Sequence, residues 1–192
     1  AESAVDLVGS DNVAAVPGAS AGMVTVGAFQ IDRYEYPNQP GALPLVNVSW
    51  VEARNLCAAR GKRLCTESEW QLAAGGPDNL RYGYGNEFDD SKCNTPYLLD
   101  GSWHRDRGTV ASGTFHGCCT GFGACDMVGN VWEWVANTAA TGPDRRVVRG
   151  GSWFHNVNFA RADGRYSRHL TPDYRLDLIG FRCCRSVSPA AT

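Results

Sequence analysis

The sequence predicts an α+β domain with short helices, a small twisted antiparallel sheet and much irregular structure. Two Ser/Thr-x-x-Glu sequences are typical of helix starts, and apolar runs at 131–136, 146–149 and 179–185 predict the strands of a central sheet. The 22 glycines and nine prolines favour turns over a helical bundle. A chain of 192 residues is long enough to bury a core as one domain.

A change of composition near residue 22 suggests the domain organisation. The predicted units are an extended N-terminal arm or linker, one domain and a C-terminal tail, over residues 1–21, 22–188 and 189–192. The arm is rich in Ala, Val, Gly and Ser and shows no sustained period. From Met23 onward, apolar residues alternate as in a strand, and the alternation slips around Gly27-Ala28.

Two short helices are predicted after this strand. Ser49 and Glu52 form a capping box, in which each side chain bonds to the other residue's amide, and the helix should stop near Gly61. Thr66 and Glu69 repeat the pattern and open a second helix that ends at a Gly-Gly pair. We expect both capping boxes to stabilise the helix starts and to have no catalytic role.

The net charge argues against nucleic acid as a partner, and the hydropathy argues against a membrane-spanning helix. The net charge is −2 and the pI is about 6.1, so the chain lacks the basic footprint of a nucleic-acid-binding protein. No apolar run approaches the roughly 18–20 residues of a membrane-spanning helix. We therefore expect neither nucleic acid as a partner nor a transmembrane segment.

The eight cysteines indicate a disulfide framework. They include the adjacent pairs Cys118-Cys119 and Cys183-Cys184, and no Cys-x-x-Cys suggests a zinc site. The polar segment 77–125 holds few apolar residues, so it needs staples or a metal ion to be ordered. Disulfides predict a periplasmic or extracellular protein, secreted after removal of a signal peptide.

Three motifs, in this order, resemble those of the formylglycine-generating enzyme (sulfatase-modifying factor) family. They are Asp-Met-Val-Gly-Asn-Val-Trp-Glu-Trp at 126–134, Arg-Gly-Gly-Ser-Trp at 149–153 and Gly-Phe-Arg-Cys at 180–183. Gly-Lys-Arg-Leu at 61–64 also matches a family turn, with Cys65 in place of a proline. The resemblance implies an elaborated C-type-lectin-like fold.

The same resemblance implies calcium binding. The family's ligands correspond here to the Asp126 side chain, the carbonyls of Gly129 and Val131, and Glu133. Calcium prefers six to eight such oxygens, from carboxylates and carbonyls together. The alternative is a solvated loop aspartate followed by a glutamate that pairs with an arginine.

A possible second calcium site is also implied by the family. It would use Asn94, Thr95 and an acidic residue some ten positions further on. The following loop differs in length here, so this residue is Asp106 or Asp100. Asp106 is the preferred candidate.

The chain departs from the family at the reactive centre. An active member binds copper(I) with two cysteines, because soft thiolates suit this soft ion. The corresponding positions are His155 and Ala160. Alanine cannot bind a metal, and one histidine cannot replace two thiolates, so copper is not expected. The chain is predicted to lack the family's oxidase activity, although a diverged reaction in the same cleft stays open.

A disulfide between Cys57 and Cys183 is implied by the resemblance. The other six cysteines cannot be paired from the sequence alone. The preferred arrangement joins them so that segment 77–125, or its neighbour, is tied to the sheet. Its pairs are Cys93–Cys118, Cys119–Cys125 and Cys65–Cys184.

These observations favour a non-catalytic, calcium-stabilised binding or structural subunit, part of a larger envelope or extracellular complex. Arginine, tyrosine and tryptophan are enriched at protein interfaces, and several lie between residues 153 and 178. The candidate surface comprises Trp153, His155, Arg161, Arg165, Tyr166, Arg168 and Tyr174. For any single arginine, an ordinary salt bridge is the alternative.

Three other functions stay open at this point. The first is a copper-dependent oxidoreductase of the formylglycine-generating type, which rests on fold analogy alone. The second is a ligand-binding variable protein of the diversity-generating retroelement type, whose hypervariable positions occupy the segment after the Arg-Gly-Gly-Ser-Trp motif. The third is a sugar-binding lectin, but the Glu-Pro-Asn and Gln-Pro-Asp signatures are absent.

Overall fold

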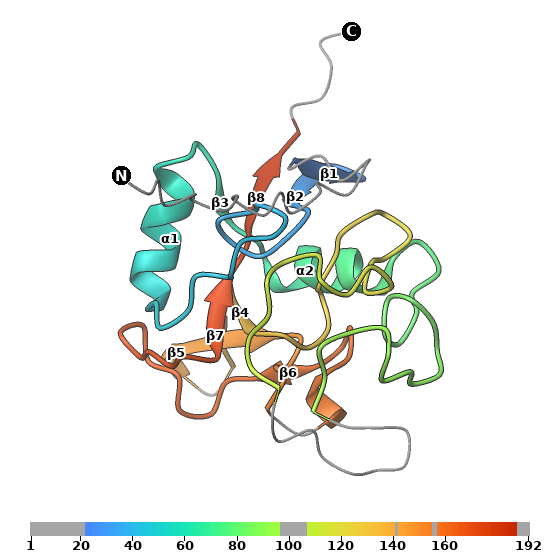
Figure 1. The fold of residues 1–192 in the computed structure, drawn as a ribbon. Helices are drawn as coiled ribbons and strands as arrows, with labels where there is room; N and C mark the ends of the chain where they lie inside the picture. The colour runs from blue at the N-terminus through green and yellow to red at the C-terminus, as the bar shows by residue number, and fades with distance from the viewer. Residues whose placement is uncertain (1–21, 97–106, 141, 155–156, 188–192) are drawn as a thin grey trace, which may run out of the picture.

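The computed structural model of the chain describes residues 22–96, 107–140, 142–154 and 157–187 (Figure 1). Its regular elements are short and separated by long irregular segments, and the predicted α+β class is confirmed. In chain order the elements are β1 (Met23–Val26), β2 (Phe29–Asp32), α1 (Trp50–Ala58), β3 (Arg63–Leu64), α2 (Glu67–Gly75), β4 (Trp132–Ala139), β5 (Gly142–Arg149), the 3-10 turn η1 (Val157–Phe159), β6 (Arg165–Tyr166), β7 (Ile179–Phe181) and β8 (Cys183–Ser186).

The first sheet has the strand order β1-β2-β8-β3, and all its pairs are antiparallel. The predicted strand that begins at Met23 is a hairpin, because β1 and β2 pair directly around Gly27-Ala28. Gly27 has a φ of 56°, in the left-handed region that glycine adopts without strain. The slip in the apolar alternation therefore marks a two-residue turn.

The second sheet has the order β6-β5-β4-β7 and contains one parallel pair, β4 with β7. The apolar run at 179–185 predicts a single strand in one central sheet. Instead, β7 belongs to the second sheet and β8 to the first, and Arg182 lies between the two strands. In Figure 1, β7 and β8 follow one another through the middle of the molecule. A single residue thus joins the two sheets.

Both predicted capping boxes are confirmed. The Ser49 amide donates to Glu52 Oε2 over 2.9 Å, and the Glu52 amide donates to Ser49 Oγ over 3.2 Å. Thr66 and Glu69 make the same two bonds at the start of α2. Each cap contributes about 1 kcal/mol, and Trp70 on α2 is fully buried in the core.

Four disulfides include all eight cysteines. Two of them fasten α1 and the segment after β3 to β8, and two lie within the irregular segment that precedes β4. The pairs are Cys57–Cys183, Cys65–Cys184, Cys93–Cys118 and Cys119–Cys125. These are the same pairs that the sequence analysis favours.

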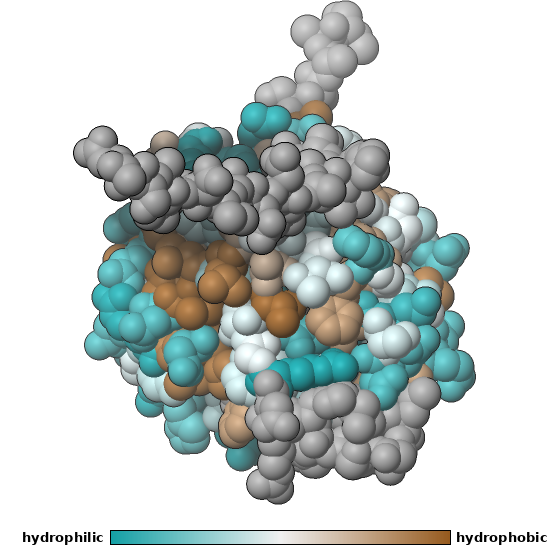
Figure 2. Space-filling view, in the orientation of Figure 1, coloured by the Kyte–Doolittle hydropathy of each residue, from teal (hydrophilic) through white to brown (hydrophobic). Residues whose placement is uncertain are grey.

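The surface carries some exposed apolar side chains. In Figure 2, hydrophobic residues gather on the side of the molecule where α1 lies. Exposed large hydrophobic residues include Leu43, Leu45 and Val51. Within the described part of the chain, no helix has the length and apolar character needed to cross a membrane.

Candidate functional site

An ion pair between Arg182 and Glu133 lies at the junction of the two sheets. Arg182 is 0% exposed and Glu133 is 1% exposed. The guanidinium donates from Nη2 to Glu133 Oε1 over 2.7 Å and from Nε to Glu133 Oε2 over 2.8 Å. Trp70 Nε1 donates to the same Oε2 over 2.7 Å. Both carboxylate oxygens of Glu133 are therefore held by protein donors.

The rest of the Arg182 guanidinium bonds to backbone carbonyls. Nη1 donates to Asp32 O (3.2 Å) and Arg33 O (2.9 Å), and Nη2 donates to Cys125 O (2.9 Å). A guanidinium has five N–H donors, and these contacts together with Glu133 use five donor directions. Because all five N–H donors of Arg182 are used, these hydrogen bonds offset the free-energy cost of burying its charge.

Two more buried carboxylates lie near this pair. Asp126 accepts a hydrogen bond from the Gly113 amide at 2.7 Å. Glu35 accepts from Asn130 Nδ2 at 2.8 Å and from Ser112 Oγ at 2.9 Å. Burial, and then the charge of Asp126, raise the pKa of Glu35 to about 8. Burial likewise raises the pKa of Asp126 to about 6.

We call Glu35, Asp126, Glu133 and Arg182 the buried acidic cluster. Three carboxylates share one guanidinium, so the cluster favours a bound proton or a cation. Glu133 pairs with an arginine, as in the alternative to calcium binding, whereas Asp126 is buried and not solvated. A calcium ion at Asp126 and Glu133 would have to share Glu133 with Arg182 and Trp70.

The other two predicted ligands of this first calcium site are backbone carbonyls. Gly129 and Val131 are buried between Asp126 and Glu133, as the motif requires. Among the described residues, no group of three or more His, Cys, Asp or Glu side chains is arranged to hold a metal ion. A calcium ion here would thus depend on carbonyl oxygens for much of its coordination. Calcium at this site stays a prediction.

Asn94 and Thr95 of the second predicted calcium site are buried and lie close to the same motif. Asn94 Nδ2 donates to Gly108 O (2.9 Å) and to Asn130 Oδ1 (3.0 Å). Among the described residues, Asn94 Oδ1 and Thr95 Oγ1 have no hydrogen-bond partner. Buried oxygens without donors are the chemistry that a hard cation needs. Asp106 and Asp100 lie outside the described residues.

The positions of the family's copper-binding thiols carry no thiol here. His155 lies outside the described residues. Ala160 is fully buried and packs in one apolar cluster with Cys93, Cys118 and Val128. The backbones of Gly151 and Ala160 pack closely against each other here. A Cβ added to Gly151 would lie only 2.7 Å from Ala160 N.

The predicted contact residues have different surroundings. Arg161 pairs with Asp163 over 3.0 Å and Arg165 pairs with Glu67 over 2.5 Å, so these two arginines also match the salt-bridge alternative. Arg168 is exposed. Trp153, Tyr166 and Tyr174 are each half-buried.

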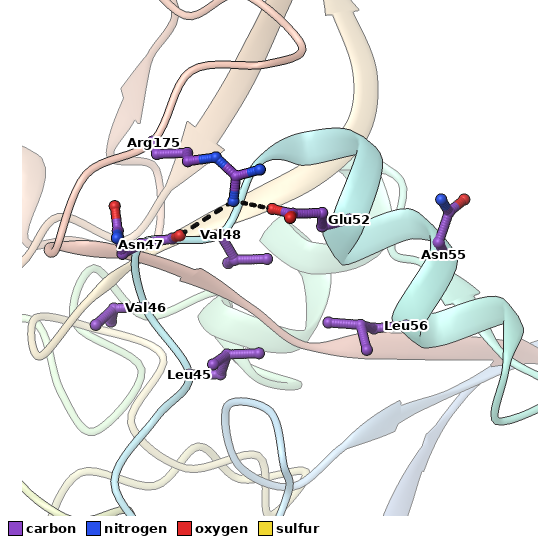
Figure 3. A pocket seen from close by; sticks show the side chains of 8 residues that line it. All are labelled: Leu45, Val46, Asn47, Val48, Glu52, Asn55, Leu56 and Arg175. Carbon is purple, nitrogen blue, oxygen red and sulfur yellow. Dashed lines mark hydrogen bonds and ion pairs between the residues drawn. The ribbon is translucent and has the colours of Figure 1, made fainter.

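A groove beside α1 was not expected from the sequence. It has a volume of about 420 Å³ and an apolar floor that includes Leu45, Val48 and Leu56. Figure 3 shows Arg175 reaching across its edge to the Glu52 carboxylate and the Asn47 carbonyl. All but one of the lining residues lie within 45–56, and Arg175 comes from a distant segment that only the folded chain brings to the groove.

The chain belongs to the sulfatase-modifying factor enzyme 1-like domain family, whose pattern it matches over residues 14–187. It is 40% identical over 158 residues to the inactive C-alpha-formylglycine-generating enzyme 2 of Mus musculus, covering 76% of this chain and 50% of that relative. It is 32% identical over 204 residues to the formylglycine-generating enzyme of Thermomonospora curvata, covering 88% of this chain and 65% of that relative. The chain thus spans about half to two thirds of the length of these relatives.

Solved structures share the fold. The Treponema denticola variable protein 1 matches with a TM-score of 0.66 at 18% identity, over 83% of this chain and 84% of that one. PvdO from Pseudomonas aeruginosa matches with a TM-score of 0.61 at 25% identity, over 89% and 73% of the two chains. The fold is therefore the formylglycine-generating-enzyme type of the C-type-lectin-like fold, as the motifs imply.

The raised pKa of Glu35 predicts a pH dependence of stability. Its folded-state pKa of about 8 lies above the ordinary value of 4.5, so the folded protein holds a proton that the unfolded chain releases between these values. In calcium-free buffer, the free energy of unfolding should therefore fall as the pH rises through this window, by at most about 1.4 kcal/mol per pH unit from this group. Urea unfolding across the window measures the slope.

Glu35→Gln should reduce this slope, because the amide does not titrate. The matched control is Glu87→Gln, which replaces an exposed glutamate and should leave the slope unchanged. A Glu35→Gln slope equal to that of the native chain would contradict the assignment.

Proposed function

We propose that this chain is a non-catalytic binding or structural module on the formylglycine-generating-enzyme scaffold. The observation that carries the proposal is that all eight cysteines are in disulfides while Ala160 occupies a position of the family's thiol pair. Linear copper(I) binding needs two soft thiolates. Without them, the oxidation of a substrate cysteine lacks its metal.

Similarity to a relative named as inactive supports this proposal. The relative at 40% identity carries that word in its name, whereas the relative at 32% is named as an enzyme. The retained motifs serve packing: Glu133 and Arg182 hold the sheets together, and Gly151 allows the close approach to Ala160. The family's motifs can therefore persist in a chain that has no reaction to catalyse.

The contact surface is proposed on the segments between residues 153 and 178. Arg168 is exposed there, and Trp153, Tyr166 and Tyr174 are half-buried, which is typical of interface anchors. A protein partner in a larger complex is the proposed ligand. Four disulfides fit a periplasmic or extracellular location.

The alternative function, a ligand-binding variable protein, is supported by similarity of fold alone. The Treponema denticola variable protein 1 is similar at 18% identity, and such a likeness concerns the fold alone. A fixed contact surface needs fewer assumptions than a diversified one, so we prefer it.

The contact surface predicts selective loss of a partner. Immobilised native chain should retain a protein from an extract of its native envelope, and Arg161→Ser combined with Arg168→Ser should reduce retention at least about tenfold, since interface arginines contribute strongly to binding. The matched control is Arg54→Ser combined with Arg185→Ser, which removes the same charge at exposed sites on α1 and β8. Equal losses in both variants would sink the proposed surface.

The missing thiols predict the absence of aldehyde formation. Incubated with copper and a Cys-x-Pro-x-Arg peptide, the chain should leave the peptide cysteine unchanged by mass spectrometry, because no thiolate pair can hold copper(I). The Thermomonospora curvata enzyme serves as the positive control. A formylglycine product made by the present chain would refute the non-catalytic proposal.

We also propose that calcium stabilises the domain through Asn94 and Thr95, whose side-chain oxygens lack donors among the described residues. Removing calcium with EDTA should lower the thermal unfolding midpoint, since a ligand at 100 times its Kd stabilises by about 2.7 kcal/mol. Asn94→Ala should abolish this difference. An unchanged midpoint after chelation would contradict both predicted calcium sites, and an effect lost only in Asp126→Asn would assign calcium to the first site.

A further inference from the structure

An apolar pocket opens on the proposed contact surface, away from the buried acidic cluster. Its volume is about 180 Å³. Strands β4, β5 and β7 form its floor, and the segments after β5 form its walls. The residues that line it are Trp132, Val148, Phe159, Tyr166, Leu170, Tyr174, Leu176 and Ile179.

The floor of the pocket is rigid. Trp132 on β4 lies opposite Ile179 on β7. Two residues further along β4, Trp134 lies opposite Val148 on β5, which lies opposite Tyr166 on β6, so the lining side chains share one face of the sheet. Trp132, Val148 and Ile179 are each buried and belong to one core cluster. Their positions are therefore set by the core and do not depend on a ligand.

Aromatic rings form one side of the pocket. The ring centroids of Trp132 and Phe159 are 5.5 Å apart, and Phe159 and Tyr166 meet edge to face at 6.2 Å. Phe159 and Tyr166 are half-buried, and both line the pocket. Edge-to-face packing with a further ring is favourable in such a setting.

The segment 171–178 contributes two more lining residues and is bonded to α1 and to the residues just before it. Tyr174 and Leu176 line the pocket, while Arg175 between them lines the groove beside α1. There Arg175 bonds to Glu52 and to the Asn47 carbonyl (Figure 3). The backbone adds a bond from the Asn47 amide to Leu176 O at 3.0 Å. The wall is thus fixed before any ligand arrives, which lowers the entropic cost of binding.

We propose that this pocket receives one aromatic side chain of the protein partner, as the anchor of the contact surface. The inference rests on the proposed function and adds the chemistry of the ligand. A protein cavity of about 150 Å³ lined by Leu, Ile and Phe binds benzene, and the present pocket is slightly larger with a similar lining. No charged residue is among its described lining residues, so an ionic group would lose its hydration without compensation.

The surroundings fit an interface. Asp173 and Asp177, which are next to the lining residues Tyr174 and Leu176 in sequence, are charged and exposed. An apolar centre with polar, exposed residues around it is the usual arrangement of a protein interface. The pocket therefore fits the centre of a protein contact.

Titration of the native chain with toluene tests the pocket directly. The methyl NMR signals of Val148, Leu170, Leu176 and Ile179 should shift through ring currents, while methyl signals elsewhere stay in place. N-acetyl-phenylalanine amide should shift the same signals, and N-acetyl-alanine amide should not. Unshifted signals at saturating toluene would overturn the proposal, and shifts with toluene but not with the blocked phenylalanine would overturn the assignment to a side chain.

A variant in which a larger side chain fills the pocket can be compared with the same substitution elsewhere. Leu176→Phe should weaken toluene binding at least tenfold, whereas Leu72→Phe, the same change at an exposed position on α2, should leave it unchanged. If Leu176→Phe does not fold, Tyr174→Ala, which removes part of the wall, should also weaken binding.

The partner-capture experiment separates the pocket proposal from the contact-surface proposal. A partner retained equally by native chain and Leu176→Phe overturns the pocket alone, and toluene binding without any retained partner counts against the contact surface alone.

Discussion

The junction of the two sheets depends on the ion pair of Arg182 with Glu133. Arg182 is the single residue between β7 and β8, and therefore between the two sheets. Its guanidinium bonds to β4 through Glu133, to the end of β2 and the residue after it, and to Cys125 in the irregular segment. Removing one partner of a buried, hydrogen-bonded pair costs about 3–5 kcal/mol. That is a large part of the stability of a typical domain, so the pair constrains the sequence strongly even without a catalytic role.

The ion pair contacts the irregular segment 77–125 at Cys125, and the disulfides stabilise this segment further. Residues 77–125 contain no helix or strand in their described part and have few apolar side chains to bury. Cys93–Cys118 and Cys119–Cys125 close loops within that region, while Cys57–Cys183 and Cys65–Cys184 attach α1 and the residue after β3 to β8. Closing a loop of about 100 residues lowers the entropy of the unfolded chain by an amount worth about 4.7 kcal/mol. Cysteine serves structure throughout this chain.

Local signals in the sequence predicted local structure well. The capping boxes at Ser49 and Thr66 give the starts of α1 and α2, because a cap is decided by residues three positions apart. The division of 179–185 between two sheets could not be predicted, since it depends on what Arg182 meets across the core. The same holds for the buried acidic cluster: Glu35 lies about 90 residues before Asp126 in sequence, and no short motif connects them. The aromatic pocket is likewise made of segments that meet only in the folded chain.

Ala160 lies where a thiol would be close to one of the disulfides of this chain. Ala160 packs in the same cluster as Cys93 and Cys118, which are bonded to each other. A thiol restored at position 160 would lie near that disulfide, and a thiolate near a disulfide can attack it and exchange. A reactive cysteine and this staple would therefore compete within one small space. If the segment that contains Ala160 carries no reaction, as we propose, then Phe159 beside Ala160 and Trp132 on β4 are available to line the pocket that we propose for a partner's side chain.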